Sequence, residues 1–76
     1  MRRVGTVVRT AGGLAVARGE PGEDPPRIGS SVVDESLATV GRVVDVFGPV
    51  DRPYVAVTPS DGDGLTSLVG GKLYAR

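Results

Sequence analysis

Residues 41–57 read GRVVDVFGPVDRPYVAV and contain the features that decide the fold. The run from Val40 to Phe47 has the strongest strand composition in the chain, because valine prefers an extended, half-buried backbone. Gly48 and Pro49 interrupt this run, and Pro53 restricts the backbone again before residues 54–57 resume it. The stretch therefore predicts two strands that are joined by a stiff turn with an aromatic residue at each end.

The rest of the chain has the composition of a small all-β domain. Valine supplies 14 of the 76 residues, and 12 glycines and 6 prolines interrupt the chain too often for long helices. This length corresponds to one domain, so residues 1–76 are expected to form a single domain. Short strands at roughly ten-residue spacing favour a small closed β-barrel, which leaves few free strand edges.

The remaining segments predict the other strands and loops. A first hairpin is expected from strands at 3–9 and 14–18, with its turn at Gly12-Gly13. Residues 20–27 (EPGEDPPR) predict an exposed loop, because proline cannot donate to a strand ladder. A short strand is expected at 31–34, a second loop at 60–64, and one or two closing strands at 65–69 and 72–74.

Strict alternation along these strands predicts which side chains share a face. In the first strand one face is expected to carry Val4, Thr6 and Val8, and the other Gly5, Val7 and Arg9. In residues 54–57 the two faces are expected to carry Tyr54 and Ala56, and Val55 and Val57.

Composition excludes several classes of site. The chain has no cysteine and no histidine, which excludes disulfides, thiolate or histidine metal sites, and Ser–His or Cys–His nucleophiles. Its net charge is +0, so no overall field attracts nucleic acid. No apolar run reaches the roughly 20 residues of a membrane helix, and Met1-Arg2-Arg3 leads into no apolar segment of the kind that a signal peptide contains. We expect a cytoplasmic protein without a cofactor or a small-molecule substrate.

The nine acidic residues include two candidate pairs, Asp34/Glu35 and Asp61/Asp63. Paired carboxylates serve as general acid and base when burial raises one pKa. Both pairs lie beside Ser or Gly in expected turns, where carboxylates accept backbone hydrogen bonds and stay ionised, so we interpret them as turn residues. A calcium-binding loop starting at Asp61 is excluded, because it needs an oxygen ligand at its fifth position and glycine at its sixth, and these positions hold Leu65 and Thr66.

The turn between Phe47 and Tyr54 admits two interpretations. Proline loses little conformational entropy on binding and aromatic rings provide much contact area with few rotatable bonds, as a preorganised protein-binding surface requires. Alternatively, Phe47 closes the end of the barrel and Gly48-Pro49 only forms a corner. Both hold if Phe47 points inward and Tyr54 outward.

Two other functions remain open at this stage. An autonomous RNA-binding barrel, OB-like or translation-factor-like, requires Arg2, Arg3, Arg9 and Arg42 to converge on one face. Recognition by stacked aromatics is disfavoured, because the chain has one Phe and two Tyr. A small hydrolase would depend on Asp34 or Asp45.

The run GRVVDVFGPV at 41–50, followed by PYVAV at 53–57, resembles the Gar-one type core subunit of H/ACA ribonucleoproteins. Arg3-Val4-Gly5, Ser31 to Asp34 and Gly71 to Tyr74 match this family in the same order. The resemblance implies a closed six-stranded β-barrel, similar to the second domain of elongation factor Tu. The chain ends at Arg76 without a glycine/arginine-rich tail, which favours the compact archaeal form.

The resemblance also implies a function. Such subunits are not enzymes; they bind the catalytic subunit of the RNA-guided pseudouridine synthase and meet the guide RNA through the complex. They influence the loop that grips substrate RNA, and so promote substrate loading and product turnover in rRNA pseudouridylation. The implied partner-binding residues are Phe47, Gly48, Pro49, Val50, Pro53 and Tyr54.

Overall fold

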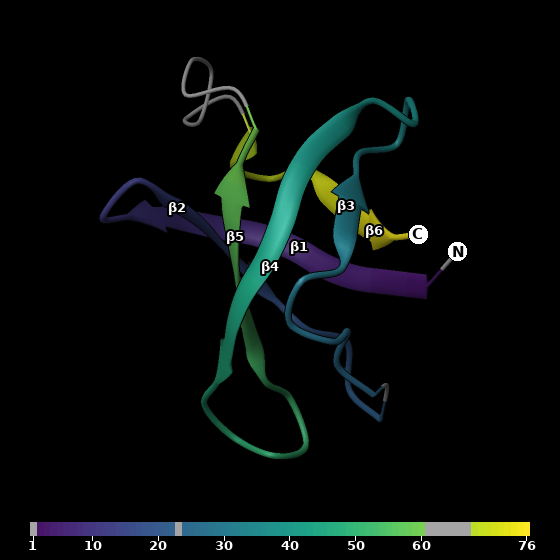
Figure 1. Ribbon diagram of the computed structural model, residues 1–76. Helices are drawn as coiled ribbons and strands as arrows, with labels where there is room; N and C mark the ends of the chain where they lie inside the picture. Colours follow the sequence, from purple (N-terminus) through teal and green to yellow (C-terminus); the bar gives the residue numbers. More distant parts are fainter. Residues whose placement is uncertain (1, 23, 61–67) are drawn as a thin grey trace.

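Six antiparallel strands close into a β-barrel in the computed structural model, which describes residues 2–22, 24–60 and 68–76. The strands are β1 (Arg2–Ala11), β2 (Leu14–Arg18), β3 (Ser31–Val33), β4 (Thr39–Phe47), β5 (Tyr54–Pro59) and β6 (Lys72–Ala75). Their order around the barrel is β1-β2-β5-β4-β3-β6, with β6 pairing back to β1 (Figure 1). The all-β barrel expected from the sequence is confirmed, and no described segment forms a helix that could cross a membrane.

The first hairpin forms as predicted. β1 and β2 pair from Thr6↔Arg18 to Ala11↔Leu14, and Gly12 and Gly13 make the turn with φ of 57° and 79°. Positive φ at both central positions matches the twist of the two strands, which is why the paired glycines form the turn here.

The predicted alternation along β1 is wrong. Val4 and Val7 are both in the core, at 2% and 1% exposure, whereas Val8 is 43% exposed. The register shifts between Arg3 and Gly5 and again between Val7 and Arg9. Each bulge inserts one residue and reverses the facing of those that follow, a local bend that helps a small sheet close on itself.

The barrel interior is packed mainly with valine and alanine from all six strands. Its buried cluster comprises Val4, Val7, Ala15, Ala17, Val32, Val40, Val43, Val55, Val57, Leu73 and Ala75. Small side chains, most of them β-branched, fill this interior, and no aromatic ring belongs to the cluster. On β5 the predicted alternation is confirmed, since Val55 and Val57 belong to this cluster and Ala56 does not.

The loops follow the sequence in outline. Residues 19–22 and 24–30 form no strand, and Asp34 begins a turn that leads from β3 to β4. The closing segment forms one strand, β6, as the lower of the two expected numbers allows, and residues 68–70 before it form a turn in which the Gly71 amide donates to the Leu68 carbonyl (2.9 Å). Of the loop predicted at 60–64, residues 61–64, with Asp61 and Asp63, lie outside the described part of the chain, as do residues 65–67.

Candidate functional site

The aromatic turn, defined as residues 47–54, connects β4 to β5 and extends from one end of the barrel (Figure 1). Phe47 is the last residue of β4 and Tyr54 the first of β5, and the two are register partners. Their rings stack at a centroid distance of 5.6 Å with 21° between the planes. Offset stacking of this kind stabilises the pair beyond the area it buries.

Both rings lie on the outer surface of the barrel. Phe47 is 38% exposed and Tyr54 half-buried, and neither belongs to the core cluster. Val55 follows Tyr54 and points into the core, so strand alternation turns the Tyr54 ring outward. The interpretation that Phe47 closes the end of the barrel is therefore wrong, since its ring is exposed and lies outside the core cluster.

Gly48 is the residue that allows the two rings to stack. Its φ is 93°, a conformation that side chains of L-residues rarely adopt. A Cβ at this position would lie 2.9 Å from Cδ2 of the Tyr54 ring. Glycine at this position therefore permits the positive φ and also leaves space for the Tyr54 ring.

The tip of the aromatic turn is exposed, and its base is attached to β2. Pro49 is exposed and Val50 is 97% exposed, while the Arg52 amide donates to the Pro49 carbonyl at 3.2 Å. Pro53 is buried, and its carbonyl accepts a 2.8 Å hydrogen bond from the Gly19 amide. The six residues expected to bind a partner thus lie on one turn, with Pro53 underneath as support.

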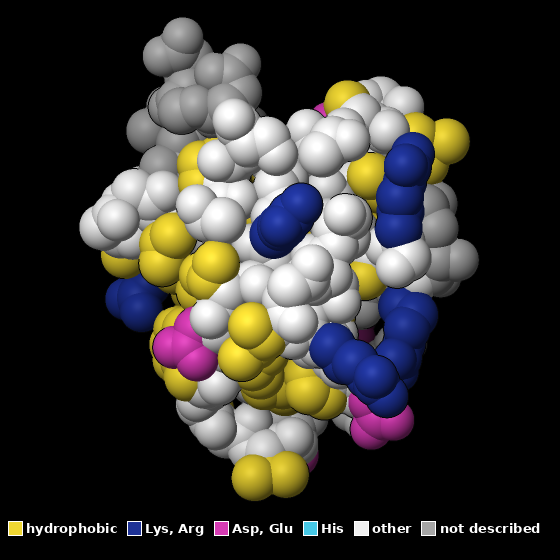
Figure 2. Space-filling model, viewed as in Figure 1, with side chains coloured by type: hydrophobic (Ala, Val, Ile, Leu, Met, Phe, Trp, Pro, Cys, Tyr) yellow, Lys and Arg dark blue, Asp and Glu magenta, His cyan; other side chains and the backbone are white. Residues whose placement is uncertain are grey.

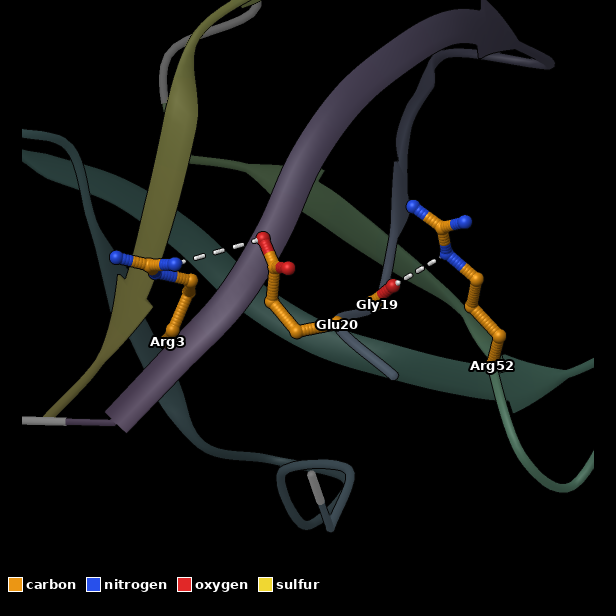
Figure 3. A network of polar contacts seen from close by, with 4 residues as sticks. All are labelled: Arg3, Gly19, Glu20 and Arg52. Carbon is orange, nitrogen blue, oxygen red and sulfur yellow. Dashed lines mark hydrogen bonds and ion pairs between the residues drawn. The ribbon is translucent and has the colours of Figure 1, made fainter. Parts of the chain in front are cut away.

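A polar network continues from this base towards β1 (Figure 3). The Arg52 Nε donates to the Gly19 carbonyl at 3.3 Å. Glu20, the next residue, lies 3.7 Å from the guanidinium of Arg3 on β1. These contacts fix the start of the 19–30 loop between the aromatic turn and β1. The sequence did not indicate them, because residues 19 and 52 carry no pattern that pairs them.

An outer apolar patch adjoins the two rings. We define it as Val16 of β2, Ala56 of β5 and Val44 of β4. Val16 and Ala56 are register partners and are each 3% exposed, yet they lie outside the core cluster, whereas Val44 is 39% exposed. Apolar side chains gather over the lower part of the β4–β5 face in Figure 2, where the aromatic turn emerges. Val44 is thus the exposed member of the patch, and the exposed Asp45 is the register partner of Ala56 on β4.

The arginines that an RNA-binding barrel would need do not meet on one face. Arg2 pairs with Asp24 (3.9 Å) and Arg3 with Glu20 (3.7 Å) at the start of β1. Arg9 lies near the other end of β1, and Arg42 lies on β4, with β2 and β5 between them. Three strand spacings correspond to roughly 14 Å, so these charges act separately rather than as one patch.

The Asp34/Glu35 pair belongs to a turn, as expected. Asp34 Oδ1 accepts from the Ser36 amide (2.9 Å), the Ser36 hydroxyl (2.6 Å) and the Ala38 amide (3.1 Å). The Ser36 hydroxyl is the main cause that lowers the pKa of Asp34, and the amides of Ala38 and Ser36 add to it. A general acid needs a raised pKa, so this geometry argues against the hydrolase interpretation at Asp34.

The other acidic residues give no better site. Asp45 Oδ1 accepts from the Val46 amide at 2.8 Å. Within residues 2–22, 24–60 and 68–76, no three acidic side chains gather where they could hold a metal ion. A cavity of about 290 Å³ beside the Asp34 turn is lined by Asp34, Glu35, Ser36, Leu68, Gly71, Lys72 and Leu73.

Comparison with known families agrees with this barrel and its turn. The sequence profile described as the Gar1/Naf1 RNA binding region matches residues 1–76. The chain belongs to this family. The resemblance seen in residues 41–57 is thereby confirmed, and the Gar1/Naf1 match covers the strands, the loops and the aromatic turn alike.

Two known proteins are similar to this Gar1/Naf1 chain. An uncharacterised protein of Methanocaldococcus jannaschii is 38% identical over 55 residues, which cover 72% of this chain and 63% of the relative. The chain thus spans less than two thirds of the length of that relative. The solved Gar1 domain of Naf1 superposes with a TM-score of 0.76 at 19% identity, over 97% of this chain and 79% of that one. At this identity the structural likeness shows the shared fold.

Proposed function

We propose that this chain is a non-catalytic subunit of an H/ACA ribonucleoprotein. It docks through the aromatic turn on the catalytic subunit of the RNA-guided pseudouridine synthase. There it promotes rRNA pseudouridylation by aiding substrate loading and product turnover, and it meets the guide RNA through the complex. Membership of the Gar1/Naf1 family supports a role in such a particle.

The observation that carries the proposal is the exposed, preorganised aromatic pair. Phe47 and Tyr54 stack outside the barrel, and the nearly fully exposed Val50 lies on the same turn. Exposed apolar side chains that are already held in place lose little entropy on binding, and aromatic residues dominate binding energy at protein interfaces. A turn built in this way is suited to grip another polypeptide while the chemistry proceeds in that partner.

The test is the affinity of the purified chain for the synthase catalytic subunit, measured by calorimetric titration. Tyr54→Ala is expected to weaken binding by about thirtyfold, corresponding to ~2 kcal/mol, because it removes a central aromatic anchor. Tyr74→Ala is the matched control, since Tyr74 is also half-buried but lies on β6, which borders β1 and β3 rather than β5.

Thermal unfolding of both variants reports whether the barrel remains folded. Equal affinities of Tyr54→Ala and Tyr74→Ala would remove the aromatic turn from the interface. Failure of the wild-type chain to bind the synthase subunit would overturn the proposed function itself.

The second candidate is an autonomous RNA-binding barrel, which the description of the family as an RNA binding region favours. Binding of isolated RNA through phosphate contacts would fall steeply with salt. The separation of Arg9 from Arg42 and the ion pairs of Arg2 and Arg3 disfavour it. Strong, salt-sensitive binding of guide RNA by the free chain would place this candidate first.

A further inference from the structure

Arg52 is attached through one side-chain hydrogen bond at the base of the aromatic turn. Its Nε donates to the Gly19 carbonyl at 3.3 Å, and the neighbouring Pro53 carbonyl accepts from the Gly19 amide at 2.8 Å. The two terminal nitrogens of the guanidinium lie on the side away from Gly19 (Figure 3). A planar guanidinium with two outward amino groups matches the two oxygens of a carboxylate.

Arg52 has no acidic partner in the described part of the chain. The ion pairs among residues 2–22, 24–60 and 68–76 are Arg2–Asp24 and Arg3–Glu20. Asp51 precedes Arg52 in sequence but makes no ion pair with it. The guanidinium is thus anchored through its Nε while its two terminal groups remain available to a carboxylate from outside.

A second cation lies on the same flank of the aromatic pair. Arg18 is the register partner of Tyr54 across β2 and β5, and it directly precedes Gly19. Its side chain is exposed and has no ion pair among the described residues. The β2 flank of the two rings is therefore cationic, although the chain as a whole has a net charge of +0.

Apolar surface continues beyond the rings on the same outer face. The exposed part of the outer apolar patch is Val44 of β4, because Val16 and Ala56 are each 3% exposed, and the acidic Asp45 faces Ala56 from β4. An apolar centre with cations on one flank is complementary to a surface that carries apolar side chains beside a carboxylate.

We propose that Arg52 binds a carboxylate of the docked partner, an aspartate or glutamate next to the apolar side chains that cover Phe47 and Tyr54. Arg18 adds positive charge to the same site. The inference rests on the proposed function and deepens it, because it states what the partner must carry at this surface.

An acidic polypeptide fits this site better than RNA. Phe47 and Tyr54 stack on each other, so each ring already uses one face that a nucleobase would need. Val16, Val44 and Ala56 have no polar side-chain group for a base or a phosphate, and Asp45, the register partner of Ala56, is acidic. These features favour an apolar protein surface with an acidic side chain.

The experiment measures binding of the full chain to the purified synthase catalytic subunit at about 0.05 M and about 0.5 M salt. Arg52→Gln is expected to lower affinity about tenfold at low salt and much less at high salt, because a charge-assisted pair is lost. Arg52→Lys keeps the charge but loses the fork and the Nε donor, and should recover about half of the loss on a logarithmic scale. Arg76→Gln is the control, an equal change of charge next to β6.

Each outcome decides between the explanations. Wild-type binding with equal affinities for Arg52→Gln and Arg76→Gln would overturn the carboxylate site and leave the proposed function standing. A loss for Arg52→Gln that persists at high salt, or that Arg52→Lys does not relieve, would assign Arg52 a structural role only. If Arg52→Gln weakened binding of isolated guide RNA but not of the synthase subunit, the site would bind phosphate and the inference would be wrong. Absence of wild-type binding would overturn the proposed function and this inference together.

Discussion

The two turns at the ends of β4 are ordered in different ways. The acidic turn, residues 34–38, is fixed by its own sequence, since Asp34 Oδ1 accepts three hydrogen bonds from Ser36 and Ala38. The aromatic turn has one hydrogen bond of its own, from the Arg52 amide to the Pro49 carbonyl. Its other hydrogen bonds reach Gly19, more than thirty residues away in sequence.

The two turns thus show two kinds of order: hydrogen bonds within a turn fix its shape, whereas hydrogen bonds to another part of the barrel fix its orientation. Local hydrogen bonds define the shape of the acidic turn, and among the residues that the structure describes no hydrogen bond joins it to an element beyond β3 and β4. The contacts of Pro53 and Arg52 with Gly19 attach the aromatic turn to the end of β2, so its rings keep a fixed place on the outer face. A docking surface needs that second kind of order, because a preorganised contact loses less entropy on binding.

The largest expected effect is on the aromatic turn, through Gly48→Ala. The new methyl group would meet the Tyr54 ring at 2.9 Å, and the backbone would remain at a φ of 93°. We expect a loss of about 2 kcal/mol in the free energy of unfolding, which lowers the melting temperature of a domain this small by about 8–16 °C. The measurement is thermal unfolding followed by circular dichroism.

Gly12→Ala provides the matched control in the first hairpin. Gly12 also has a positive φ, 57°, but a Cβ there would meet nothing within 4 Å. Its cost is therefore the backbone conformation alone, about 1 kcal/mol. If both variants melted at the same temperature, the ring contact would contribute nothing and the aromatic turn would be no more tightly built than a simple hairpin.

The sequence predicted the acidic turn and the strands well, because their determinants are local. Asp-Glu-Ser after a short valine strand, Gly12-Gly13 between two strands, and the breaks at Gly48 and Pro49 each act within a few residues. All of these features occur where they were expected.

Other features depend on contacts that no short pattern encodes. The bulge that turns Val8 outward arises from pairing around a closed barrel, which alternation along one strand cannot anticipate. The outward position of Phe47 depends on the narrow, valine-filled interior. The link between Arg52 and Gly19 exists because the β4–β5 turn packs beside the end of β2, so this part of the site appeared only with the structure.

A smaller effect is expected from Asp34→Asn, which tests whether the acidic turn depends on charge. The pKa of Asp34 is lowered in the folded chain from its ordinary 3.8, so ionised Asp34 stabilises the fold above that pH. This stabilisation is lost as the pH falls through the lower, folded-state pKa. We therefore expect wild type to melt above Asp34→Asn at pH 7, with the two converging in acid. A difference that stayed constant over the whole pH range would assign the effect to the hydrogen bonds alone.

The smallest expected effect is a gain in stability on substitution of Leu37, and it tests whether the backbone of the acidic turn is strained at this residue. Leu37 has a φ of 69° and is 54% exposed, so it occupies a left-handed conformation without burying its side chain. Asparagine adopts this conformation more readily than leucine. Leu37→Asn should raise the melting temperature by a few degrees, about 0.5 kcal/mol, whereas Leu37→Ala removes the same exposed side chain and should give no gain. An equal rise of the melting temperature in both variants would attribute the gain to loss of exposed apolar surface. The positive φ of Leu37 would then cost no measurable stability.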